Sequence, residues 1–282
     1  MATLSDYVKL MQYKIVALLV LSAVAGFVIA NGLIAHLELK NLAIIILAIA
    51  AGGCGAELLN KVIEADIDKK MERTKNRATA RGKLDKTHGM IYGVLLSAVG
   101  IVLGSLANFL TAVMIFLGVF FYIIVYTIWL KRRSRFSIVI GGLAGSFCVW
   151  AGVTSASGTI TLPGFVLGLL VLFWIPGHIW SFAIKYRKDY LKAGVPMLTA
   201  VESRRIGTRV IALFNIIMAA LSVYMVLFLR WYYTAIIVIP LAFSLYLSFK
   251  TIIDNTAAWT LFKFSSIYLT FVFIGVIIAA LV

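Results

Sequence analysis

Repeated apolar segments of about twenty residues place the strongest constraint on the fold of this chain, because an α-helix of that length crosses the hydrocarbon core of a bilayer. Hydrophobic residues make up 62% of the 282 positions and charged residues only 13%. We therefore predict an all-α polytopic membrane protein, one domain over residues 1–282 with no room for a soluble domain. The nine predicted spans are 15–34, 42–59, 89–107, 110–130, 137–156, 162–184, 208–229, 231–249 and 262–282.

The basic residues between these segments predict the orientation. All 26 Lys and Arg residues except Lys40 and Arg230 lie in the N-terminal segment or around the connections after the second, fourth, sixth and eighth spans. Because cytoplasmic loops are enriched in Lys and Arg, we expect a cell-membrane protein with its N-terminus in the cytoplasm and its C-terminus outside. The net charge of +15 suggests nucleic acid, but topology and anionic lipid headgroups explain cations in membrane-adjacent loops. We therefore expect membrane lipid, and no nucleic acid, as a partner.

A dense charged cluster follows the second span, with the sequence NKVIEADIDKKMERTKNR from Asn60 to Arg77. Charged groups at a membrane boundary are costly unless they face a cavity, a partner or an ion. Asn60, Glu64 and Asp68 lie four residues apart, so an α-helix carries all three on one face, whereas Asp66 points elsewhere. The spacing predicts a set of three oxygen ligands.

A second long connection, after the sixth span, has a similar layout. The first covers about 69–88 and the second about 185–207, and each begins with a charged segment at the end of a span. The second places Asp189 and Tyr190 just before Lys192. Because helical membrane proteins often form a site where two corresponding halves meet, we predict a substrate cleft between these connections.

The residue types point to diphosphate chemistry. Hard oxygen ligands suit Mg²⁺, which binds through one or two carboxylates, waters and the oxygens of a substrate phosphate. Four cations are expected around the carboxylates and would hold the rest of a diphosphate: Arg73, Arg77, Lys131 and Lys185. The metal and these cations would stabilise a departing pyrophosphate. Solvated helix ends and topology signals explain any one of these residues, but not the whole set.

These motifs resemble those of a known family. The spacing of Asn60, Glu64 and Asp68 is similar to the first metal-diphosphate motif of the UbiA-type intramembrane prenyltransferases, which form a nine-helix bundle around a central cavity. The stretches DIDKKMERTKNR, YTIWLKRR, IVIGGLAG and DYLKAGVPML resemble its protohaem IX farnesyltransferase branch. This resemblance implies transfer of a farnesyl group from farnesyl diphosphate to the vinyl group of haem b, which makes haem O and releases diphosphate. It also implies association with haem A synthase or with terminal oxidase assembly.

The charge pattern and the resemblance together define the candidate site. The catalytic candidates are Asn60, Glu64, Asp68, Arg73, Arg77 and Asp189, and those expected to bind Mg²⁺ are Asn60, Glu64, Asp68 and Asp189. The substrate-binding candidates are Tyr126, Lys131, Lys185, His178, Tyr190 and Lys192. Three readings of His178 stay open: a structural residue, a contact to haem, or a general base. Tyr122, Tyr126 and Trp150 are candidates to line the prenyl cavity, since aromatic faces stabilise a carbocation.

Some positions depart from the family pattern and leave the acceptor open. Glu64 stands where the first motif normally carries Asp, Ser137 stands where the branch usually carries Asn, and several prolines of the branch are missing. The alternative is a UbiA-type enzyme that prenylates an aromatic quinone precursor or a glycerol lipid. A transporter is a third alternative, but its relay carboxylates should recur within several spans, whereas here they gather at the ends of two.

Overall fold

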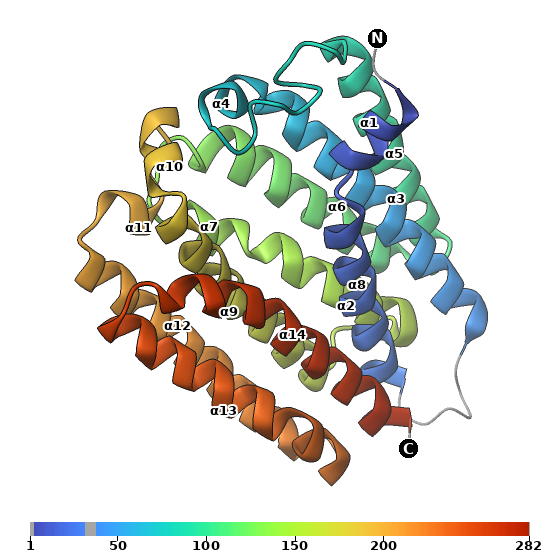
Figure 1. Cartoon of the computed structure of the whole chain (residues 1–282). Coiled ribbons are helices and arrows are strands. Elements are labelled where there is room, and N and C mark those ends of the chain that lie inside the picture. Colours follow the sequence, from blue (N-terminus) through green and yellow to red (C-terminus); the bar gives the residue numbers. More distant parts are fainter. Residues whose placement is uncertain (1–2, 32–37, 282) are drawn as a thin grey trace.

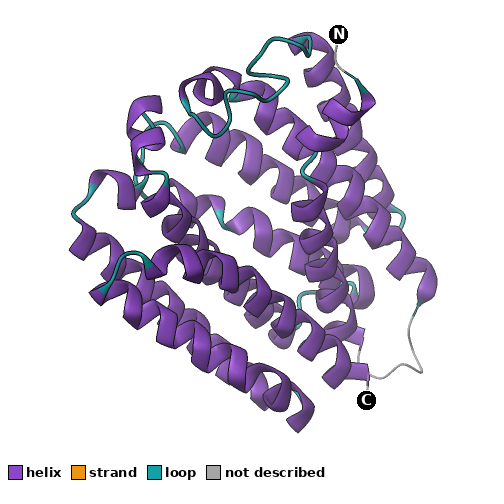
Figure 2. Cartoon of the chain, in the orientation of Figure 1, coloured by secondary structure: helices purple, strands orange, loops and turns teal. Residues whose placement is uncertain are grey.

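The computed structural model describes residues 3–31 and 38–281, and every regular element in this part of the chain is a helix (Figure 2). Nine segments of the described chain are long and apolar enough to span a membrane. Six are single helices or pairs in the first two-thirds of the chain: α2 (Tyr13–Asn31), α3 (Leu39–Ile63), α5 (Lys86–Ser105), α6 (Phe109–Phe120) with η2 (Phe121–Leu130), α7 (Ser137–Gly141) with α8 (Leu143–Ser157), and α9 (Leu162–Lys185). The last three are α12 (Arg204–Tyr224) with η3 (Met225–Leu227), α13 (Trp231–Ile253) and α14 (Ala257–Leu281).

The structure confirms the predicted fold, a polytopic bundle of helices, and each predicted span coincides with one of these segments. Positions 32–34 of the first predicted span and position 282 of the last lie outside the described residues. The clearest difference is α3, which was predicted to end at 59 but continues to Ile63. Its last turns carry Asn60 and Lys61, which are buried. Polar residues therefore extend the helix here because they face the protein interior rather than lipid.

The bundle has an apolar outer surface as well as an apolar core. Large side chains such as Phe109, Leu227 and Ile253 are 81%, 73% and 89% exposed. In water such exposure would be costly, but lipid tails are as apolar as these side chains. The structure thus has the surface of a multi-pass membrane protein.

Close contact between α2 and α8 holds the bundle together at the end where α14 finishes (Figure 1). Gly152 lies so near α2 that an added Cβ would be 1.9 Å from the backbone oxygen of Ala23, and a Cβ on Gly26 would be 2.3 Å from that of Val149. Small residues permit such approach of membrane helices. Because these glycines lie in the second halves of α2 and α8, their contact leaves the opposite end of the bundle free for a cavity.

Short helices cover that opposite end: α1 (Leu4–Leu10), α4 (Ala65–Lys70), α10 (Arg187–Ala193) and α11 (Leu198–Val201) (Figure 1). The two long connections meet there through a buried apolar cluster that joins Ile67 and Met71 to Tyr190, Val195 and Met197. The two charged connections identified in the sequence therefore lie side by side.

The segment η2 is wound as a π-helix, with backbone hydrogen bonds between residues five apart. The pattern continues to the residue after η2, because the N–H of Lys131 donates to the carbonyl of Tyr126 at 2.8 Å. Tyr122 and Lys131 are nine residues apart, so an α-helix would place them about 180° apart. The i→i+5 pattern winds more slowly and completes about two turns over the same nine residues. Tyr122, Tyr126 and Lys131 consequently share one face, which lines the cavity.

Candidate active site

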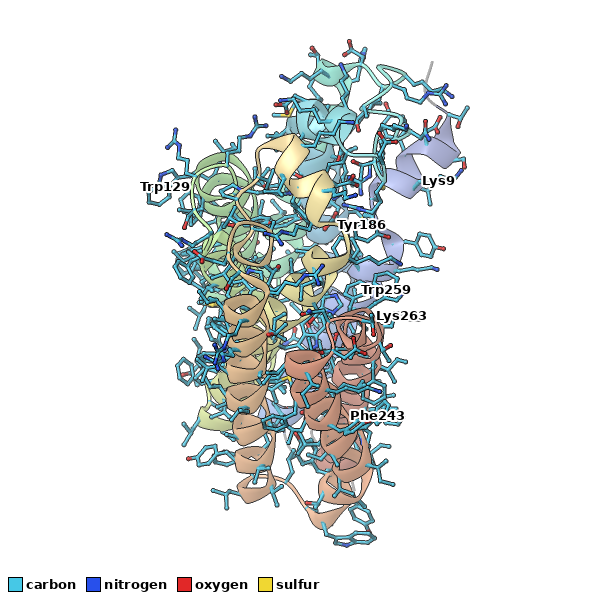
Figure 3. The ribbon with its side chains drawn as sticks, turned by 60° about the vertical axis from the view of Figure 1, so that its left-hand side comes forward. Lys9, Trp129, Tyr186, Phe243, Trp259 and Lys263 are labelled. Carbon is cyan, nitrogen blue, oxygen red and sulfur yellow. The ribbon has the colours of Figure 1, made fainter. Side chains whose placement is uncertain are left out.

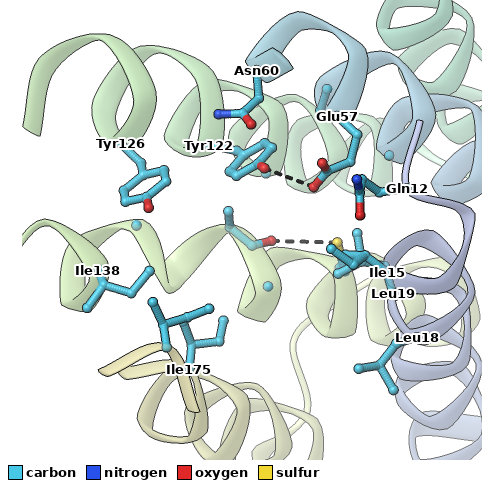
Figure 4. Close-up of a pocket in the computed structure, with 18 of the residues that line it drawn as sticks. Gln12, Ile15, Leu18, Leu19, Glu57, Asn60, Tyr122, Tyr126, Ile138 and Ile175 are labelled. Carbon is cyan, nitrogen blue, oxygen red and sulfur yellow. Dashed lines mark hydrogen bonds between the residues drawn. The ribbon is translucent and has the colours of Figure 1, made fainter. Parts of the chain in front are cut away.

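A cavity of about 810 Å³ opens among α2, α3, α6, η2, α8, α9 and α14. One region of its wall is apolar, with Ile15, Leu18 and Ile175 among its members. Glu57 and Tyr122, joined by a hydrogen bond, lie on the polar region in Figure 4. A cavity of this composition accommodates a molecule with a charged head and a hydrocarbon body.

Three polar contacts connect the C-terminal part of α3 to η2. Two of the residues involved lie just beyond these helices: Glu64 follows α3, and Lys131 follows η2. The three contacts are Tyr122 OH to Glu57 Oε1 at 2.8 Å, Asn60 Nδ2 to Thr127 Oγ1 at 3.0 Å, and Lys131 Nζ to Glu64 Oε2 at 2.6 Å. Each contact lies about one helical turn beyond the previous one. They fix the polar wall from the interior of the bundle to its charged end.

The charged end contains two buried carboxylates, each paired with a cation. Glu64 and Asp68 are each 3% exposed. Lys131 pairs with Glu64, and Arg77 Nη1 donates to both oxygens of Asp68 at 2.9 and 2.8 Å. Helical backbone hydrogen bonds continue across the boundary between α3 and α4. The Glu64 N–H donates to the carbonyl of Asn60, and the Asp68 N–H donates to the carbonyl of Glu64. All three oxygen-bearing side chains line the cavity, as their spacing predicted.

This donor set fits a hard divalent cation that is bound together with substrate. Among the described residues, no three Asp, Glu, His or Cys side chains converge closely enough to hold a metal by themselves. Two carboxylates on a cavity wall are nevertheless what Mg²⁺ uses when phosphate oxygens and waters complete its shell. The site is therefore suited to a metal–diphosphate pair rather than to a metal alone.

Arg73 joins the two long connections at the cavity edge. Its guanidinium lies 5.0 Å from the ring centre of Phe182 and 5.6 Å from that of Tyr186, and its backbone N–H donates to Asp189 Oδ2 at 3.3 Å. Cation–π contacts of this kind hold an arginine in place while its N–H groups remain available to a ligand. Asp189 thus supports the Arg73 loop.

Nine of the twelve candidates line the main cavity and three do not. Asp189 and Lys185 line a neighbouring pocket of about 560 Å³, and the exposed Lys192 lies 3.4 Å from Glu72. The Lys185 ammonium lies 3.5 Å from the ring centre of Trp259, which lies close to Tyr186 (Figure 3). The nine candidates that line the main cavity are Asn60, Glu64, Asp68, Arg73, Arg77, Tyr126, Lys131, His178 and Tyr190.

His178 has a fixed orientation on the α9 wall. Its ring stacks on Trp174 at 4.5 Å and contacts Phe262 at 4.4 Å, and its Nδ1 lies 2.6 Å from Ser265 Oγ. The Ser265 hydroxyl also lies 2.8 Å from the carbonyl of Phe262, and when it donates there its oxygen accepts from His178 Nδ1–H. This tautomer leaves the lone pair of Nε2 available to a ligand.

The sequence analysis missed three charged residues of the cavity wall: Lys14 at the start of α2, and Glu57 and Lys61 of α3. Glu57 and Lys61 form an ion pair with 2.9 Å between Oε2 and Nζ, and Lys61 Nζ also donates to Asn60 Oδ1 at 2.7 Å. The available signal was their spacing of four within an apolar run, which places both near the helical face of Asn60 and Glu64.

Two further groups near the charged end have shifted pKa values. Asp66 points away from the cavity, as predicted, and hydrogen bonds from Arg132 hold the pKa of its carboxyl below the usual range. Burial raises the pKa of Tyr190 to about 12, so this cavity-lining phenol stays protonated and can donate a hydrogen bond at neutral pH.

Comparison with known proteins identifies the family. A protoheme IX farnesyltransferase of Sulfurisphaera tokodaii is 39% identical over 285 residues, which cover 99% of this chain and 94% of that protein. A digeranylgeranylglyceryl phosphate synthase structure superposes with a TM-score of 0.79 at 17% identity, covering 98% of each chain. A UbiA homologue from Archaeoglobus fulgidus, bound to GPP and Mg²⁺, superposes with a TM-score of 0.70 at 12% identity and covers 96% and 99%. At these identities the two structures show a shared fold.

The family match also covers nearly the whole chain. The model of the UbiA prenyltransferase family matches residues 19–277, which include all the residues that line the cavity except Gln12, Lys14, Ile15 and Leu18. With the full-length similarity to the Sulfurisphaera tokodaii protein, this match identifies the chain as an enzyme, a membrane prenyltransferase that belongs to the UbiA prenyltransferase family.

Proposed function

We propose that this prenyltransferase moves a farnesyl group from farnesyl diphosphate to the vinyl group of protohaem IX, with Mg²⁺ as cofactor. The observation that carries the proposal is a single cavity with two chemically different regions. Paired carboxylates and cations form one, and His178, between aromatic rings and with Nε2 available, belongs to the other. The similarity to a protoheme IX farnesyltransferase over 99% of the chain supports the acceptor.

The charged end binds and ionises the donor in this proposal. Mg²⁺ held by Glu64 and Asp68 would neutralise charge on the leaving diphosphate. Arg77 and Lys131 exchange their carboxylate partners for phosphate oxygens. Arg73 reaches the diphosphate from the long connection after α4. Arg offers paired N–H donors that match phosphate geometry, whereas Lys acts as a point charge.

The aromatic wall of η2 faces the reacting carbon in this proposal. Tyr122 and Tyr126 stack with their ring centres 6.1 Å apart, and both rings line the cavity. Aromatic faces attract a cation, each by about 0.5 to 2 kcal/mol. When the C–O bond to diphosphate breaks, these faces stabilise the allylic cation until the vinyl group forms the new C–C bond. Water then adds to the carbocation left on the other former vinyl carbon and releases a proton, which gives a neutral hydroxylated product.

The acceptor lies against α9 and α14. His178 Nε2 provides a ligand for the haem iron, while Trp174 and Phe262 hold the imidazole plane and Ser265 holds its tautomer. The apolar side chains of α2 then surround the hydrocarbon parts of both substrates. Of the three readings of His178, this arrangement supports an acceptor contact.

The remaining assignments concern the whole protein. We infer a single-domain protein of the cell membrane, with its N-terminus in the cytoplasm, its C-terminus outside and its charged end open to the cytoplasm, because the basic residues gather there. Asp189 acts through Arg73, while direct roles for Asp189 in metal binding and for Lys185 and Lys192 in substrate binding stay predictions. Association with haem A synthase or terminal oxidase assembly is likewise a prediction.

Expression in a host that lacks haem O tests the proposed function. Haems extracted from the membranes and separated by chromatography should include a species with the mass of haem O. The matched control is the Asp68→Asn variant, expressed to the same level, which should yield only haem b. Absence of haem O with the wild-type protein, together with prenylation of a phenol or a glycerol lipid, would overturn the acceptor and leave the family assignment intact.

A further inference from the structure

Lys61 places a buried ammonium group in the wall of the main cavity. Only 7% of the residue is exposed, although it belongs to a membrane-spanning segment. An ionisable residue in such a segment is costly unless it is paired and faces a cavity. Lys61 meets both conditions, since it pairs with Glu57 and lines the cavity.

The surroundings of this ammonium satisfy only part of its hydrogen-bonding capacity. An ammonium has three N–H donors. One donates to Glu57 Oε2 at 2.9 Å and one to Asn60 Oδ1 at 2.7 Å, while the other oxygen of Glu57 accepts from Tyr122. Within the described residues, no third acceptor is recorded for Lys61. The remaining N–H is available to a molecule in the cavity.

The contact with Asn60 bears on the metal. The side-chain oxygen is the atom through which Asn60 would bind a cation, and the Lys61 ammonium already lies 2.7 Å from it. The other end of the Asn60 amide is held by Thr127. A divalent ion at the same oxygen would meet a like charge at close range, which is unfavourable in a poorly solvated wall.

We propose that Lys61 is a fixed cation of the diphosphate site. Its ammonium takes the place of a metal ion on Asn60 Oδ1 and donates its third N–H to a diphosphate oxygen, so that Mg²⁺ rests on Glu64 and Asp68. Asn60 and Glu64 are one turn apart, about 6 Å along the helix, so one diphosphate reaches both cations. The inference rests on the proposed binding of a prenyl diphosphate.

Binding of a non-reacting donor analogue without metal provides the test. Farnesyl thiodiphosphate is titrated calorimetrically into the purified protein in detergent, once with excess EDTA and once with saturating Mg²⁺. Three proteins are compared: wild type, Glu57→Gln, which keeps the ammonium, and the double variant Glu57→Gln/Lys61→Met, which removes both charges without leaving one unpaired. Thermal unfolding verifies that each is folded.

Wild type and Glu57→Gln should retain measurable affinity in EDTA, and the double variant should bind at least about tenfold more weakly, since it lacks one charge-assisted hydrogen bond. Lys40→Met removes an exposed lysine at the far end of the same helix, α3, away from the residues that line the cavity, and should leave the affinity unchanged. Equal affinities of Glu57→Gln and the double variant in EDTA would overturn the role of Lys61. Absence of binding by wild type even with Mg²⁺ would instead overturn the proposed function.

Discussion

At the residue scale, the polar wall of the cavity is a set of charges that neutralise one another before any substrate enters. Lys131 neutralises Glu64, Arg77 neutralises Asp68, and Lys61 neutralises Glu57. Removing one partner of a buried pair typically costs about 3 to 5 kcal/mol, because the other charge remains buried and unpaired. A metal–diphosphate ligand carries both signs of charge, so it can replace the partners on both sides at once.

The carboxylates of Glu64 and Asp68 should be required for their charge. Glu64→Asp keeps an anionic oxygen ligand and should be tolerated, whereas Glu64→Gln and Asp68→Asn keep the size but lose the charge that Mg²⁺ prefers. Product formation is measured for each variant across a Mg²⁺ titration. Full activity of both amide variants over the whole titration would refute the metal assignment.

Arg77 and His178 should separate donor binding from acceptor binding. Arg77→Ala removes a charge-assisted contact to diphosphate, which corresponds to about 1.5 to 3 kcal/mol, or roughly ten- to a hundredfold in donor affinity. His178→Ala should leave donor affinity nearly unchanged and weaken haem binding. Farnesyl diphosphate binding is followed in detergent, and haem binding is followed by its Soret band.

The same two binding measurements can contradict these assignments. If the His178 variant keeps the Soret band of the wild type and the Arg77 variant keeps its donor affinity, neither assignment stands. Ser265→Ala is a useful companion, because it removes the acceptor that holds His178 Nδ1–H without touching the imidazole. Its Soret band should shift while its donor affinity stays the same.

At the element scale, glycine contacts and the π-helix decide where the cavity lies. The α2–α8 contact closes one end of the bundle. The winding of η2 then turns Tyr122, Tyr126 and Lys131 toward α3. There Tyr122 donates a hydrogen bond to Glu57, and Lys131 donates one to Glu64. Together these two features place the polar wall of the cavity.

Gly152 should be intolerant of even one added methyl group. Gly152→Ala would put a Cβ 1.9 Å from a backbone oxygen of α2, and backbone cannot move aside as a side chain can. Overpacking of this kind costs about 1 to 3 kcal/mol, so the melting temperature in detergent should fall. Gly53→Ala is the matched control, since its nearest neighbours would lie at 3.5 Å. Equal melting temperatures of the two variants would contradict the tight contact.

At the scale of the whole molecule, the basic residues gather at the end of the bundle that carries α4 and α10, and the cavity has its charged region at the same end. A charged donor can reach this region from water, while the apolar region stays within the membrane. The asymmetry of charge therefore predicts one orientation for both the protein and its active site.

Cysteine accessibility in intact cells tests this orientation. Cys54 and Cys148 are free and are first replaced by alanine. Single cysteines at Lys75, Arg133 and Lys192 should resist a membrane-impermeant reagent added from outside, because their loops are cytoplasmic. Cysteines at Lys40 and Arg230 should react. The reverse labelling pattern would invert the topology.

The sequence by itself determined the nine spans and the shared helical face of Asn60, Glu64 and Asp68. Both depend on local properties: apolar length predicts a span, and a spacing of four places Asn60, Glu64 and Asp68 on one helical face. The residues that pack across the bundle were beyond this reasoning. Lys61 was overlooked because its sequence neighbours do not reveal whether it faces lipid, water or a cavity.

Only the tertiary structure decided which distant residues meet. Ser265 lies 87 positions from His178 and still holds its ring, and the π-helix brings Lys131 to the face of Tyr122 where α-helical periodicity would separate them. It also placed Asp189 beside Arg73 and outside the cavity wall. The physical reason is that composition and periodicity act within a helix, whereas side-chain orientation at a site depends on how helices far apart in the chain pack together.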